Sequence, residues 1–104
     1  MTEPEVSTIA IKNGNIYLTS EVYETYFKDI QSVVLISRDE KLFILPINQA
    51  GGSGLLLKIR NAKGDRIIHT QEQLREFDIN ETVEYPIPIR WDSQYSGLHL
   101  ILPT

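Results

Sequence analysis

The sequence predicts a mainly β protein with two short helices, an α+β fold made of two tandem β-turn-β-α-β-β units. Three observations predict it. Short apolar segments and turn residues follow one another in the same order in both halves. In each half, a segment with a helix-start signal and helical apolar spacing follows the second apolar segment. A glycine-rich linker, residues 48–54, joins the halves at the midpoint.

The first unit covers residues 8–47. A tight turn at residues 13–15 separates its first two strands, and a helix separates the second strand from the third. Thr19 or Ser20 is expected to cap this helix. The apolar stripe of the helix consists of Val22, Tyr23, Tyr26, Phe27 and Ile30. The predicted strands are residues 9–11, 16–18, 33–36 and 42–45.

The second unit covers residues 55–103 and repeats this order. Thr70 and Gln73 match a capping box, in which each side chain bonds the backbone amide of the other, so a second helix is expected there. We therefore expect a single domain, residues 8–104, made of two pseudo-repeats and preceded by a disordered stretch, residues 1–7. The predicted strands of this unit are residues 55–59, 66–68, 83–91 and 98–102.

Two prolines mark the strand predicted at residues 83–91. Successive amides in a strand point to opposite edges, so Pro86 and Pro88 lack donors on the same edge. That edge cannot complete a ladder, and we expect the strand to lie at a sheet margin. One interpretation is protection of the margin against aggregation. The other is a docking site for a protein partner, with Tyr95 of the following loop as a further contact.

Composition restricts the classes of function. The chain contains no cysteine, which excludes disulfides and thiolate metal sites. Its net charge of −4 weighs against non-specific binding of nucleic acid. The N-terminal residues lack the pattern of a signal peptide, and no apolar run is long enough to cross a bilayer. We therefore expect a cytoplasmic protein that does not enter the membrane.

No motif in the sequence indicates catalysis. His69 and His99 are the two histidines, and neither has a metal-ligand pattern around it. A nucleophile elbow, paired catalytic carboxylates and a dinucleotide fingerprint are all missing from the sequence. We therefore expect no catalytic residue, no cofactor and no metal ion, and we do not expect an enzyme.

A turn glycine, a short apolar strand and a threonine-started helix occur in residues 14–22 (GNIYLTSEV) and in residues 64–75 (GDRIIHTQEQLR). This pattern resembles the MraZ and AbrB-like proteins. The resemblance implies a small swapped-hairpin β-barrel, with two such units in tandem as in MraZ-like chains. The sequence departs from the family at Asn15, where arginine is usual, and at Thr19 and Thr70, where proline is usual.

Three functions follow from these observations. The first is a non-catalytic protein-interaction module in regulation or assembly, forming a homodimer. The second is a DNA-binding transcriptional regulator of the MraZ and AbrB-like type, although the net charge of −4 disfavours DNA. The third is a small-molecule binder or enzyme that uses the barrel interior, with His69 or His99 beside a carboxylate. Candidate contacts for DNA or another anion are Lys58, Arg60, Lys63 and Arg66.

Overall fold

The computed structural model describes residues 8–39, 41–47, 54–77 and 85–101. Within them the chain forms nine strands and two short helices, which confirms the mainly β fold class. The first half contains β1 (Thr8–Lys12), β2 (Asn15–Leu18), α1 (Ser20–Tyr26), β3 (Ser32–Arg38) and β4 (Lys41–Ile47). The second half contains β5 (Leu55–Leu56), β6 (Lys58–Ile59), β7 (Arg66–His69), α2 (Gln71–Glu76), β8 (Tyr85–Asp92) and β9 (Gly97–Leu100).

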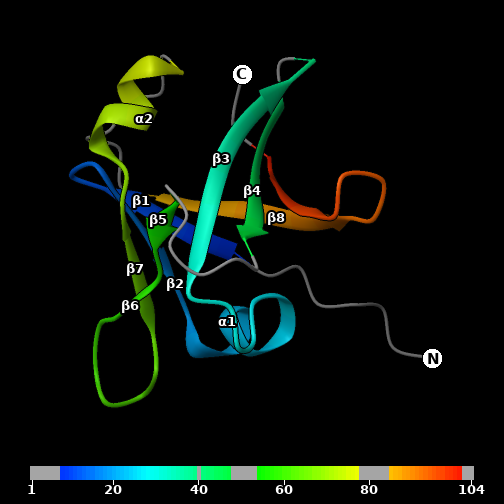
Figure 1. The fold of residues 1–104 in the computed structure, drawn as a ribbon. Coiled ribbons are helices and arrows are strands. Elements are labelled where there is room, and N and C mark those ends of the chain that lie inside the picture. Colours follow the sequence, from blue (N-terminus) through cyan, green and yellow to red (C-terminus); the bar gives the residue numbers. More distant parts are fainter. Residues whose placement is uncertain (1–7, 40, 48–53, 78–84, 102–104) are drawn as a thin grey trace.

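The strands form one antiparallel sheet that curls into a nearly closed barrel (Figure 1). The strand order is β5-β3-β4-β9-β8-β1-β2-β7-β6. Its two end strands, β5 and β6, are separated along the chain by Leu57 alone, so one short segment closes the barrel. That segment pairs with β3 through its first two residues and with β7 through its last two. The single strand predicted at residues 55–59 is therefore divided between two neighbours.

The two halves of the chain are interleaved. Each strand of the first half has a neighbour from the second half: β1 pairs with β8, β2 with β7, β3 with β5, and β4 with β9. The pairing scheme is unchanged when the strands of the two halves are exchanged. Neither half supplies all the neighbours that its own strands need, so we expect the barrel to require both. The duplication itself stays a prediction.

The core lies inside the barrel. Side chains that alternate along each strand point inward and pack into one cluster, as the period of two in the sequence requires. Thr70 is the one polar residue among the buried residues described. The fully buried side chains are Ile11, Ile16, Leu18, Phe27, Val33, Phe43, Ile44, Ile68, Leu74, Ile87, Leu98 and Leu100.

Each helix begins against the turn of the other half. The Ser20 N–H at the start of α1 donates to Oδ1 of Asp65 at 2.8 Å, while the Thr19 hydroxyl accepts from the Val22 N–H at 3.2 Å. At the start of α2, the Thr70 N–H donates to the Gly14 carbonyl at 2.9 Å. These bonds satisfy helix-end donors and join the halves.

The predicted capping box of the second helix is wrong. Thr70 makes no side-chain cap bond, because its hydroxyl donates instead to the Gly14 carbonyl at 3.2 Å. The predicted stripe of the first helix is confirmed. Val22 and Phe27 are buried, and the two tyrosines and Ile30 pack against the core. In Figure 1, α2 lies at the upper left, above β7, and α1 lies near the bottom, below the lower end of β3.

The prediction that the proline strand lies at a sheet margin is also wrong. β8 lies between β9 and β1 in the strand order, and Pro86 and Pro88 pair with Ala10 and Thr8 of β1. The prolines instead limit the ladder between β8 and β9. On β8, the residues that pair with β9 begin at Ile89. Pro88 contributes its carbonyl there, accepting from the Ile101 N–H at 2.9 Å. The edge of β8 that faces β9 therefore lacks the amide donors of the two prolines, although β8 is an interior strand of the sheet.

Some predictions concern residues outside the described part of the chain. These are the disordered stretch at residues 1–7, residues 48–53 of the linker, and residues 83–84 of the proline strand. Neither of the helices described is long and apolar enough to span a membrane.

Candidate functional site

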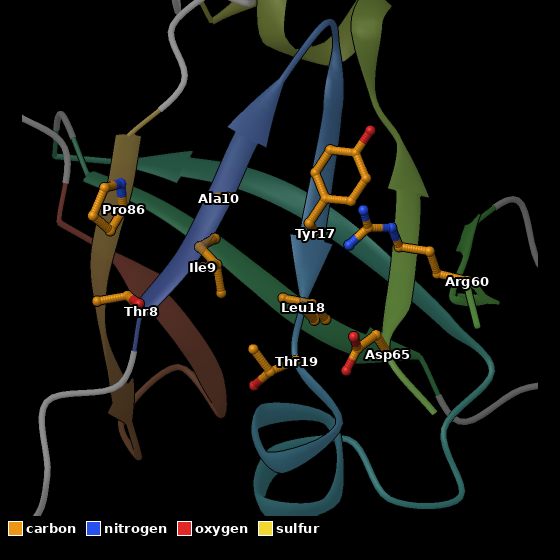
Figure 2. A pocket seen from close by; sticks show the side chains of 9 residues that line it. All are labelled: Thr8, Ile9, Ala10, Tyr17, Leu18, Thr19, Arg60, Asp65 and Pro86. Carbon is orange, nitrogen blue, oxygen red and sulfur yellow. The ribbon is translucent and has the colours of Figure 1, made fainter. Parts of the chain in front are cut away.

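A groove of about 320 Å³ lies on the outer face of the barrel across β8, β1 and β2, and reaches the turn between β6 and β7 (Figure 2). We call it the outer groove. Tyr17 and Arg60 lie on one side of it and Pro86 on the other, with Ala10 between (Figure 2). Its lining residues are Thr8, Ile9, Ala10, Tyr17, Leu18, Thr19, Arg60, Asp65 and Pro86.

The local sequence explains the hollow. Pairing between β1 and β2 runs from Lys12 to Ala10 and stops there, where Ala10 is opposite Tyr17. β1 then continues beside β8, and β2 ends at Leu18. Ala10 also lies opposite Pro86 on its other side, so the small alanine separates two bulky rings along one row of the outer face. A methyl group between two rings leaves a depression.

Tyr17 and Arg60 form the charged wall of the outer groove. The Arg60 guanidinium carbon lies 4.7 Å from the centre of the Tyr17 ring, a cation–π contact that holds a long side chain over the sheet. Arg60 is exposed and Tyr17 half-buried. The guanidinium therefore keeps donors available to an anionic group while its position is restricted by the ring.

Asp65 links this wall to α1. Its carboxylate accepts the Ser20 N–H at 2.8 Å and the Asn61 side-chain amide at 3.0 Å. These bonds, first that from Asn61 and then that from Ser20, hold the pKa of Asp65 below its ordinary value, with smaller help from the charges of Lys63 and Arg60. Asp65 is therefore held in its charged form and acts as a brace between the turn and the helix.

This brace makes stability depend on pH. Because the folded-state pKa of Asp65 is lowered, its contribution is complete above the unfolded-state pKa of about 3.9 and is lost as pH falls through the folded-state value. We expect Asp65→Asn to show a smaller drop in melting temperature than the wild type between neutral and strongly acidic pH. Thermal unfolding followed by circular dichroism measures this, and equal drops would contradict the prediction.

The four predicted anion contacts do not form one patch. Lys58 and Arg60 are exposed on the outer face of β6 and the residue after it, and Lys63 is exposed in the turn. Arg66 belongs to the opposite face, where its guanidinium lies 3.8 Å from the centre of the Tyr23 ring of α1. Its Nη1 atom also donates to the Gly64 carbonyl.

The three predicted partner contacts are likewise separated. Pro86 is exposed and lines the outer groove, and Pro88 is half-buried beside Thr8. Tyr95 lies on another part of the surface, where its ring centre is 4.9 Å from that of Phe43. It helps to cover Phe43, which is fully buried although it points away from the barrel core.

Neither histidine has a carboxylate hydrogen-bond partner among the contacts of the described residues. His69 is exposed, and its Nδ1 lies 2.8 Å from the Asn15 side-chain oxygen. The ring centre of His99 lies 5.1 Å from that of Phe43. Partial burial lowers the pKa of His99, and the charges of Lys41 and Arg90 act in the same direction, against the opposite effect of Asp92. Within the described residues there is also no cluster of side chains that could hold a metal ion.

Comparison with known proteins does not assign a family. No family model matches the chain, and neither a curated protein nor a solved structure matches it. The resemblance to MraZ and AbrB-like proteins therefore remains a prediction about sequence pattern.

Of the residues that line the outer groove, Arg60 and Pro86 belong to the predicted sites, whereas Ala10 and Asp65 are among those that do not. Alternation along residues 8–12 places Ala10 on the outer face, so its orientation was readable from the sequence. Its two bulky neighbours were not readable, because they depend on the registers of β1 with β2 and β8. Asp65 contacts Ser20 from 45 positions away, which no local pattern signals.

Proposed function

We propose that this protein is a non-catalytic interaction module that binds a short extended segment of a partner protein in the outer groove. The observation that carries the proposal is the hollow over Ala10, with an aromatic ring and a ring-held guanidinium on one side and a proline on the other. Concave, mostly apolar surfaces with a few placed polar groups are the usual form of a binding site.

The groove suggests what the segment contributes. An apolar side chain fits over Ala10 between Tyr17 and Pro86, where it would displace water from both rings. A carboxylate beside it would accept from the Arg60 guanidinium, whose ring contact reduces the freedom lost on binding. The hydroxyl groups of Thr8 and Thr19 line the same groove and offer further polar contacts.

The arrangement of cations supports a peptide over a DNA duplex. A duplex is held by several cations that contact its phosphates together. Here Arg66 lies against Tyr23 on the opposite face from Arg60, which leaves fewer cations on any one surface than the sequence implied. The barrel interior supports a non-catalytic function as well, since its one buried polar side chain among those described, Thr70, is used in a structural bond.

Filling the hollow tests the proposal. Peptides selected from a displayed random library against the wild-type protein should bind Ala10→Phe at least about tenfold more weakly, because the new ring occupies the place of the ligand's apolar side chain. Isothermal titration measures the affinities. The matched control is Val34→Phe, which adds the same ring at an exposed position of β3, outside the groove.

Two results would contradict the proposal. One is equal binding of the selected peptides to the wild type and Ala10→Phe. The other is an equal loss for Val34→Phe, which would place the site elsewhere on the barrel. Circular dichroism of both variants shows whether each has kept its fold.

A further inference from the structure

A second cleft of about 450 Å³ lies beside the segment of β5 and β6 that closes the barrel. We call it the seam. Among the strands that the structure describes, β6 has β7 as its one neighbour. The other edge of β6 faces α1 and the chain that leads into β3. The lining residues of the seam are Tyr23, Ile30, Gln31, Leu56, Leu57, Lys58, Ile59 and Arg66.

The backbone of β6 presents a hydrogen-bonding edge to the seam. The Leu57 N–H donates to the Gln31 carbonyl at 2.8 Å, on the β3 side of the segment. The Arg60 N–H donates to the Asp65 carbonyl at 2.7 Å, on the β7 side. Because residues of a strand alternate between its two edges, the N–H and C=O groups of Ile59 point away from β7 and into the seam.

Exposed apolar side chains flank the same edge. Ile59 is 70% exposed and Leu56 is 56% exposed, the two largest values among the large apolar residues described. An apolar cluster at an unpaired strand edge invites pairing with another strand, and proteins normally protect such edges with charge or cover. Tyr23 and Ile30 provide an apolar wall opposite β6.

The charge of the seam has one sign. Among the described residues that line it, Lys58 and Arg66 carry a charge and none is a carboxylate. Arg66 is held against the Tyr23 ring at 3.8 Å, so its charge is fixed at the wall of the cleft. This differs from the charge of the whole chain, which is −4. An acidic segment is complementary to such a cleft.

We propose that the seam binds an extended acidic segment of a partner protein, which adds to the free edge of β6 as a further strand. Apolar side chains on one face of that segment would lie against Ile59 and Tyr23, and carboxylates on its other face would lie near Lys58. Main-chain bonds to Ile59 supply affinity that does not depend on sequence, and the side chains supply specificity. No described residue lines both the seam and the outer groove, so this site does not depend on the function proposed above.

A synthetic peptide of alternating valine and glutamate is a suitable probe. Added to the ¹⁵N-labelled protein, it should shift the amide signals of Leu57, Ile59 and Tyr23 and leave those around Ala10 unchanged. A peptide of alternating valine and lysine should bind at least about tenfold more weakly, because its lysines meet Lys58 with like charge.

N-methylation of the peptide tests strand addition directly. Methyl groups on the amides of one parity block bonds to β6, and those on the other parity point away from it. One methylated peptide should therefore lose about tenfold or more in affinity while its counterpart binds as the parent does. Equal affinity of both methylated peptides, or no shift of the seam signals with any peptide, would overturn the proposal.

Protein variants give an independent measurement. Ile59→Pro removes the donor that faces the seam but none that faces β7, so the fold should remain while the affinity for the valine–glutamate peptide falls. If that variant fails to fold, Ile59→Ser removes the apolar contact without changing the backbone, with Val34→Ser as the control. Unchanged affinity in the folded variant would overturn the assignment, as would concentration-dependent seam shifts without peptide, which would mean that a second copy occupies the site.

Discussion

Replacing Phe27 by alanine is expected to lower the free energy of unfolding by about 3–5 kcal/mol. Phe27 ends α1, is 0% exposed and belongs to the barrel core. Its N–H donates to the Tyr23 carbonyl and its own carbonyl accepts from the Ile30 N–H, both at 2.8 Å, so the backbone around the cavity is held in place. A cavity that cannot collapse costs most. Urea unfolding with linear extrapolation measures the loss.

Phe43→Ala is the matched control for this prediction. Phe43 is also 0% exposed, but it lies outside the barrel core, where Tyr95 and His99 cover it. These surface side chains can move into the space that the ring leaves, so we expect a smaller loss than for Phe27→Ala. Equal losses in the two variants would show that the outer aromatic cluster is as rigid as the core and would contradict the prediction.

Replacing Gly14 by alanine is expected to lower the free energy of unfolding by about 2–4 kcal/mol, the sum of left-handed backbone strain and overpacking. Gly14 has a φ of +80°, and an added Cβ would lie 2.8 Å from the Cβ of Gln71. Relief of that contact requires the turn to move from α2, which weakens the two bonds from Thr70 to the Gly14 carbonyl. Thermal and urea unfolding measure the effect.

Gly64→Ala separates the two causes. Gly64 has a φ of +93°, similar to that of Gly14, but the nearest atom to an added Cβ is 3.6 Å away, an ordinary contact. This variant should therefore show the strain of about 1–2 kcal/mol without the overpacking. If Gly64→Ala lost as much stability as Gly14→Ala, the close approach to Gln71 would contribute nothing and the explanation given for Gly14 would be wrong.

The paired glycines also illustrate how the two halves hold each other. Each turn glycine lies against the first residue of the other half's helix, Gly14 against Gln71 and Gly64 against Ser20. The Asp65 carboxylate bonds the Ser20 N–H at one of these junctions, and the Gly14 carbonyl accepts from Thr70 at the other. A change in either turn therefore alters the contacts at the start of the other half's helix, so we expect substitutions in the turns to lower stability.

Local patterns in the sequence were sufficient for the elements. Alternation of apolar residues predicts strands because side chains in a strand point to opposite faces, and Ile9 and Ile11 are buried as that period requires. The apolar stripe containing Val22 and Phe27 predicts α1, because residues at this spacing lie on one face of a helix. These patterns depend on residues within a few positions of one another, so they can be recognised without knowledge of the fold.

Local patterns misjudged the elements whose partners are distant. The prolines of β8 correctly indicated an edge without donors, yet the strand is interior, because β1 pairs with its other edge. Thr70 matched a capping box, but a carbonyl from 56 positions away competes for its hydroxyl. In both cases a contact made by the fold was stronger than the local preference.

The candidate sites likewise depend on contacts between residues that are distant in the sequence. The sequence showed that Lys58, Arg60 and Arg66 are close along the chain, but the alternation of the strands and two ring contacts send Arg60 to the outer groove and Arg66 to the seam. Spacing along the chain sets which face a side chain takes. Which other segment shares that face depends on the register in which core side chains from both halves pack together, and that register exists only in the folded chain.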